Sequence, residues 1–154
     1  MARISLPPTT STAGTGSGKA EAHVRGVLAA DFTSTATGAY IDIGLSGTIP
    51  AGTVTADGIC TVNTYLEVSN STNQNIIDGL GISSGGTPTG PAFYCWETPG
   101  AVDNAVAFSA HASNTVTSGN AIVIRTFVYQ SSAGTITVKG AADRAILTAQ
   151  YFAT

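Results

Sequence analysis

Two histidines, His23 and His111, are the only imidazoles in the chain, and Cys60 and Cys95 are its only thiols. Nucleophilic catalysis needs a base beside a hydroxyl or a thiol. Both histidines fall in strand patterns, where we interpret them as structural or surface groups. The histidines and cysteines also lack the spacing of zinc ligands. The sequence therefore predicts no enzyme, no cofactor and no metal site.

Other catalytic patterns are equally weak. The segment Gly81-Ile82-Ser83-Ser84-Gly85 resembles a nucleophile elbow, but Gly86-Thr87-Pro88 stands where the required helix should begin. Paired carboxylates would have to converge in a cleft, and the chain has only three glutamates and six aspartates. Most of these acids are interpreted as turn residues, as in Asp57-Gly58 and Asp78-Gly79.

The two cysteines have two interpretations. Cys60 is in phase with Val62 and Leu66, and Cys95 is in phase with Phe93, which predicts small buried thiols that stay reduced. The alternative is a Cys60–Cys95 disulfide across two facing sheets.

Tyr94 and Trp96 share one face of a predicted strand. Such a pair on a solvent-facing surface can stack on a sugar or anchor a protein contact. The alternative is simple packing against a loop or a neighbouring subunit. A glycan receptor is therefore one candidate partner.

The composition narrows the function further. A chain of 154 residues fits one domain, and only 10% of its residues are charged. The net charge is −3 and the six basic residues are dispersed, so the sequence predicts no basic surface that would bind nucleic acid. No signal peptide and no apolar run of transmembrane length is visible, so we expect no membrane partner and production in a cytoplasm.

Residues 1–22 are rich in Pro, Thr, Ser and Gly, and we expect a flexible or extended N-terminal arm. Ile4 and Leu6 give the arm a small apolar anchor, and Pro7 and Pro8 pre-extend it. The alternative is a disordered tail without a partner.

From residue 23 to residue 154 the pattern predicts an all-β domain, a jelly-roll-type antiparallel β-sandwich. An immunoglobulin-like sandwich is the rival, but Trp96 adjoins Cys95 instead of lying between two cysteines. The segment 83–91 is expected to be an exposed loop. We expect nine strands, near residues 23–31, 38–45, 59–68, 74–82, 91–97, 105–113, 121–129, 134–139 and 145–152.

Two of these strands, 121–129 and 145–152, are apolar on both faces. A strand that lines one core should alternate between apolar and polar residues. Since little helix is available to cover a second face, the pattern predicts an obligate oligomer.

The segments 131–140 and 144–152 resemble the closing hairpin of small bacteriophage structural domains, which have the trimeric jelly-roll of the tumour-necrosis-factor-like type. In such trimers the final strand lies in the inner sheet and faces the threefold axis. The resemblance thus implies a homotrimer, in agreement with the two-faced strands. The expected interface residues are Val123, Phe127, Tyr129, Leu147, Ala149 and Tyr151.

The resemblance implies a virion protein, assembled in the host cytoplasm. The first hypothesis is a capsid decoration (cement) protein that binds the major capsid protein of the shell through the arm. The second is a receptor- or glycan-binding tip of a tail or head fibre, although only a short arm precedes the domain here. A small jelly-roll hydrolase or cupin is the third.

Overall fold

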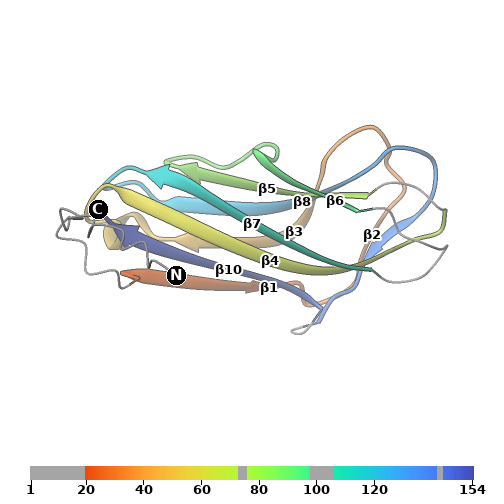
Figure 1. The fold of residues 1–154 in the computed structure, drawn as a ribbon, viewed down its shortest axis with the longest axis horizontal. Coiled ribbons are helices and arrows are strands. Elements are labelled where there is room, and N and C mark those ends of the chain that lie inside the picture. Colours follow the sequence, from red (N-terminus) through yellow and green to blue (C-terminus); the bar gives the residue numbers. More distant parts are fainter. Residues whose placement is uncertain (1–19, 73–75, 98–105, 142–143) are drawn as a thin grey trace, which may run out of the picture.

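The computed structural model describes residues 20–72, 76–97, 106–141 and 144–154. Within these residues the chain forms ten β-strands and one short 3-10 helix, η1 (Ala51–Thr53), and it contains no α-helix. The long strands run along the long axis of the domain (Figure 1). The strands are β1 (Ala22–Val27), β2 (Phe32–Ser34), β3 (Ile41–Ile49), β4 (Gly58–Asn70), β5 (Ile76–Ser84), β6 (Phe93–Glu97), β7 (Val106–Val116), β8 (Ile122–Gln130), β9 (Ile136–Val138) and β10 (Ala145–Ala153).

All nine expected strands are present with shifted ends, and β2 is an additional one. The first expected strand ends at Val27, and the chain then forms β2, which pairs with β9. Three residues are too short to give a recognisable alternation, so β2 was not predicted. Phe32 packs against the core and holds β2 in place.

The strands form two antiparallel sheets. In the first sheet β1, β10, β4 and β7 lie side by side, and β9 and β2 continue it past the ends of β10 and β1. The second sheet has the order β3-β8-β5-β6. The first long strand thus pairs with the last, as the double Greek key of a jelly roll requires. The predicted jelly-roll sandwich is confirmed, and the immunoglobulin-like alternative is wrong.

The core lies between the two sheets and follows the alternation of each strand. On β4 the even-numbered residues from Cys60 to Asn70 are buried, and on β10 the odd-numbered residues from Ala145 to Tyr151 are buried. One buried hydrogen bond joins the sheets where the Asn70 amide donates to Gln130 Oε1 at 3.1 Å. Another joins Thr64 to Asp78 at 3.1 Å.

Asp78 corrects a sequence prediction. It lies in the middle of β5 with 1% of its surface exposed, so Asp78-Gly79 is not a turn. A glycine is needed at position 79 for a different reason, because a Cβ there would lie 2.6 Å from Cβ of Pro91. The loop after β5 packs directly on the strand backbone at this point.

The outer face of the second sheet is partly covered by that same loop. A Cβ on Gly81 would lie 2.6 Å from Cβ of Pro88 and 3.1 Å from Cε2 of Phe127, so loop, strand and ring meet there. Phe127 is 3% exposed. Residues 83–91 are therefore not simply an exposed loop, since Pro88 and Pro91 are half-buried. The second apolar face of β8 is thus covered in part by the chain itself.

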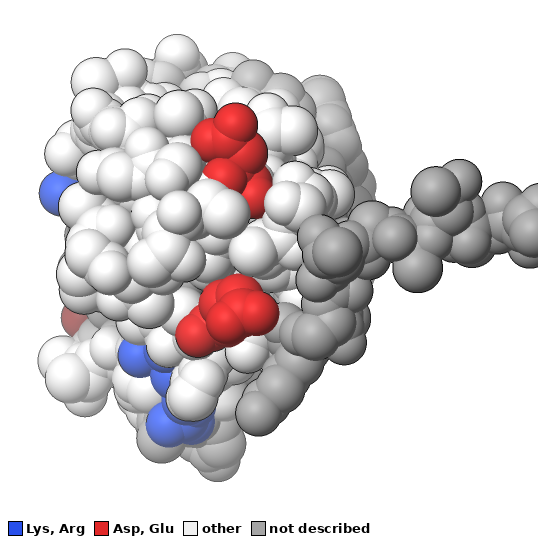
Figure 2. All heavy atoms as spheres, turned by 90° about the vertical axis from the view of Figure 1, so that its left-hand side faces the viewer, with Lys and Arg blue, Asp and Glu red and all other residues white. Residues whose placement is uncertain are grey.

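Charged side chains are few and dispersed on the described surface. Figure 2 shows the end of the domain where β10 finishes, where most of the surface is uncharged. Between described residues, ion pairs join Arg125 to Asp42, Lys139 to Asp31 and Arg144 to Glu67. No helix in the described ranges is long and apolar enough to cross a membrane.

Candidate assembly face and its polar pocket

The outward side of β1, β10, β4 and β7 forms one continuous surface, which we call the open face. Its described side chains are all exposed or half-buried on a single chain. The antiparallel register aligns them in rows that cross the sheet. The rows contain Phe152, Ile59 and Thr115; His23, Gln150, Thr61 and Ser113; Arg25, Thr148, Asn63 and His111; and Val27, Ile146, Tyr65 and Ser109.

The two ends of the open face are apolar. Val27 and Tyr65 are 37% and 38% exposed and flank half-buried Ile146 at one end. Ile59 is 41% exposed and lies beside Phe152 at the other end. Three of the four exposed large hydrophobic side chains among the described residues therefore lie on this one face. Such a concentration on a single surface is typical of a contact site.

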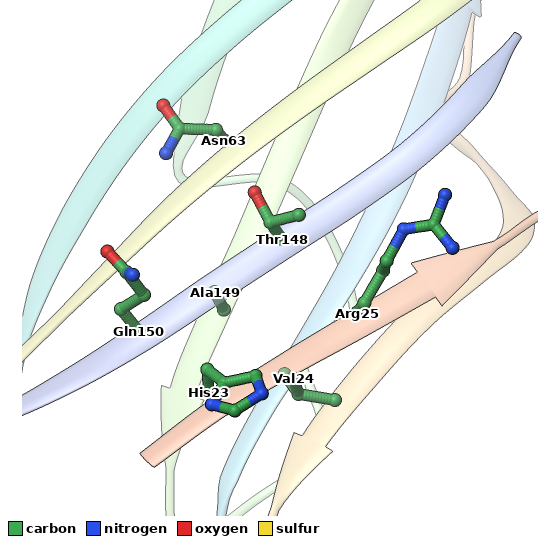
Figure 3. A pocket seen from close by; sticks show the side chains of 7 residues that line it. All are labelled: His23, Val24, Arg25, Asn63, Thr148, Ala149 and Gln150. Atoms are coloured by element: carbon green, nitrogen blue, oxygen red, sulfur yellow. The ribbon is translucent and has the colours of Figure 1, made fainter. Parts of the chain in front are cut away.

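The two middle rows are polar and contain both histidines. His111 and Asn63 form a hydrogen bond between Nδ1 and Oδ1 at 2.8 Å. The amide of Asn63 is thereby turned so that its nitrogen points toward β10, as Figure 3 shows. The interpretation of both histidines as surface groups is confirmed, since both are exposed.

A pocket of about 390 Å³ lies in these middle rows, between β1 and β10. Figure 3 shows the side chains of β1 on one side of it and those of β10 and β4 on the other. Polar groups of arginine, histidine, two amides and a threonine line it together with apolar surface. Its lining consists of His23, Val24, Arg25, Asn63, Thr148, Ala149 and Gln150.

The thiol of Cys60 lies apart from these histidines. It is buried in the core and free, so the disulfide with Cys95 that the sequence left open is not formed. Burial raises the pKa of this thiol to about 11, which keeps it protonated and unreactive. Within the described part of the chain, no three His, Cys, Asp or Glu side chains come together as metal ligands would.

The predicted interface residues do not lie on one surface. Leu147, Ala149 and Tyr151 are at most 1% exposed within a single chain, because they face the other sheet. The phenolic hydroxyl of Tyr151 donates to the carbonyl of Ala56 at 2.7 Å and fixes the loop before β4. These three residues are unavailable to a partner, so their assignment is wrong. The residues of β10 that face outward have the opposite parity.

The other three predicted interface residues, Val123, Phe127 and Tyr129, lie on the outer face of the second sheet. They alternate with inward-facing residues of β8, so they cannot line one axis together with β10. Tyr129 instead packs against Tyr40, with ring centroids 5.2 Å apart.

Some predicted residues lie outside the described part of the structure. The backbone of β6 contains Tyr94 and Trp96, and Trp96 pairs with Ile77, but the side chains of both aromatic residues are outside the description. The arm residues Ile4, Leu6, Pro7 and Pro8 are outside it as well. Sugar stacking and capsid anchoring therefore stay predictions.

Sequence reasoning missed the exposed apolar residues of β4. The sequence did contain a pattern that could have revealed them. The outward-facing residues of β4 have large apolar side chains at both ends of the series Ile59, Thr61, Asn63 and Tyr65. The same phase of β10 carries Ile146 and Phe152. Reading the two strands as neighbours would have identified the face.

Comparison with solved structures agrees with this topology. The structure of Eiger TNF from S. frugiperda superposes with a TM-score of 0.55 at 8% sequence identity, covering 83% of this chain and 90% of that one. The fold is a TNF-like jelly roll. A structure of infectious bursal disease virus, Gx strain, gives a TM-score of 0.42 at 15% identity, with 100% of this chain and 41% of that chain covered. No protein-family model and no curated protein matches the sequence.

Proposed function

We propose that this chain is a non-enzymatic structural protein that assembles as a homotrimer through the open face. The observation that carries the proposal is the position of Val27, Ile59 and Tyr65, three exposed apolar side chains on one sheet. The remainder of that face is largely uncharged. Burial of apolar area is the main driving force of stable association.

The size of the face suits an interface. Four strands spaced about 4.8 Å apart and about nine residues long present on the order of 600 Å². A standard interface buries about 800 Å² on each partner. The polar middle rows would fix the register between copies, because buried donors and acceptors must find partners. β10 lies in this sheet, which is where the final strand lies in the trimeric phage domains that the sequence resembles.

Within a virion, we assign the trimer to the outside of the head as a capsid decoration protein of a bacteriophage. Such a protein cements the shell because it binds only the assembled lattice and so stabilises it by mass action. The partner would be the major capsid protein. The arm, through Ile4 and Leu6, is the proposed anchor, and three arms on one trimer would bind with avidity.

The experiment that tests this function adds the purified full chain to phage shells that lack it. Sedimentation of the shells then measures the bound copies relative to the major capsid protein. We expect saturation at three copies per trimer site across the whole shell, and weaker binding when residues 1–19 are deleted. Absence of binding to shells, together with binding to a host-surface glycan, would contradict decoration and favour the fibre-tip hypothesis.

A further inference from the structure

Both imidazoles of the chain lie in the two middle rows of the open face. His23 is on β1 and His111 is on β7, the two outer strands of that face, and both side chains are exposed. Histidine is the side chain that ordinarily changes its charge between about pH 5 and pH 8. The charge that this face presents to a partner therefore depends on pH.

The hydrogen bond between His111 and Asn63 determines what His111 offers to a partner. The amide nitrogen of Asn63 points toward β10 in Figure 3, so its Oδ1 accepts from Nδ1 of His111 at 2.8 Å. A neutral imidazole that donates from Nδ1 has an acceptor at Nε2. Protonation converts Nε2 into a donor and adds a positive charge, so a contact that pairs with the neutral ring is lost.

No described carboxylate lies beside His111 to offset such a charge. β7 contains no other charged residue, and Asp78 of β5 faces Thr64 in the core. β4 has the phenol of Tyr65 near His111, whereas its Glu67 lies at the far end of the face and pairs with Arg144.

His23 has more charged neighbours. Glu21 and Arg25 flank it on β1, and Arg25 has an interaction of its own. β10 contains no charged residue, and the only charged residue of β3 is Asp42. Because Glu21 can offset a charge on His23, His111 is the stronger sensor of acid.

We propose that the two middle rows make the homotrimer sensitive to acid: the chains associate while His111 and His23 are neutral and separate when these imidazoles gain protons. This inference rests on the proposed function, because only the homotrimer buries the two rows. A charged imidazole in a dehydrated interface without a counter-charge is costly. By linkage, acid weakens the association that excludes these protons.

The fold itself should persist in mild acid. Burial raises the pKa of Asp78 from its ordinary value of 3.8 to about 7. The folded chain thus favours the protonated acid, and the contribution of Asp78 to stability grows as pH falls from about 7. Loss of the trimer in mild acid would then be dissociation without unfolding.

The test measures the mass of the full chain by light scattering over a dilution series at about pH 7.5 and at about pH 5.5. Each histidine that must be neutral in the trimer should lower the association constant by about tenfold over this range. Three copies of His111 alone should therefore weaken trimerisation by about a thousandfold. Circular dichroism of the acid sample should show a folded chain.

Two variants separate the histidines from other groups. The double variant His23→Gln/His111→Asn cannot gain these protons and keeps a donor for Asn63, so it should be trimeric at both pH values. Asp78→Asn removes a titrating group from the core without changing the open face, and it should dissociate in acid as the unmutated chain does.

The outcomes distinguish the acid response from the assembly. A trimer with the same association constant at both pH values, or acid dissociation that the double variant retains, would overturn the acid response and leave the proposed assembly intact. A monomeric mass for the unmutated chain at both pH values would overturn the assembly, and the acid response with it.

Discussion

Thr64 and Asp78 join the two sheets inside the core: Oγ1 of Thr64 donates to Oδ2 of Asp78 at 3.1 Å. The other carboxylate oxygen, Oδ1, has no hydrogen-bond partner among the residues that the structure describes. Burial raises the pKa of Asp78 from its ordinary value of 3.8 to about 7, while the bonds from Thr64 and from the backbone of Gly79 oppose the rise. The folded protein therefore favours the neutral acid at this position.

The first prediction is that the protein loses stability as pH rises from about 4 to about 7. The folded pKa of Asp78 is above its unfolded value, so its full contribution to stability is present below pH 3.8 and is lost as pH rises through about 7. The change in unfolding free energy at this site is at most about 4 kcal/mol. Urea denaturation at a series of pH values measures it.

Asp78→Asn is the matched variant for that prediction. The amide cannot ionise, and its oxygen can still accept from Thr64. The variant should show a flatter stability profile between pH 4 and pH 7 and should gain stability relative to the unmutated chain at neutral pH. Equal slopes for the two proteins would show that Asp78 does not control the pH response.

The second prediction concerns Cys60. Because burial raises its pKa to about 11, the thiol should not react with an alkylating reagent in the native protein at pH 8. A Cys95→Ala variant leaves Cys60 as the only thiol, so mass spectrometry can count its modification. Denaturation should expose Cys60 to full labelling. Native labelling at the rate of a free thiol would show that the core opens at this strand.

The third prediction tests the packing of the loop after β5. Gly81→Ala would place a Cβ 2.6 Å from Cβ of Pro88, which we expect to cost about 1–3 kcal/mol of stability. Gly52→Ala is the control, because nothing lies within 4 Å of the added carbon. Thermal unfolding compares the two variants. A Tm for Gly81→Ala equal to that of the control would contradict the close approach of this loop to the strand.

The fold was largely predictable because nine strand patterns and their turns are local in the sequence. The side of β10 that faces the core was not predictable from the sequence. Both the odd-numbered and the even-numbered residues of that strand include apolar side chains, and the sheet opposite decides which set is buried. Asp78 was misread for a similar reason. An Asp-Gly pair is a strong local turn signal, and the packing of Pro91 on Gly79 that explains it is distant in sequence.

The candidate site was less predictable than the fold. The pocket depends on the pairing of β1, β10 and β4, which are separated by most of the chain. Neither His23 nor Asn63 belongs to a local motif, so only the register brings them to one surface. The prediction of an oligomer came from strands that are apolar on both faces, but the exposed residues that now support it are different ones.

The central claim is that the open face is a subunit interface, and sedimentation equilibrium tests it most directly. The unmutated chain should have a mass three times that of the 15.4 kDa monomer. Tyr65→Arg, on the open face, should yield a folded monomer because it places a charge in the interface. Tyr40→Arg should stay trimeric, since Tyr40 is equally exposed, at 37% against 38%, but lies just before β3 and packs against Tyr129 of the other sheet. A monomeric mass for the unmutated chain at micromolar concentration, or dissociation by Tyr40→Arg and not by Tyr65→Arg, would contradict the assignment.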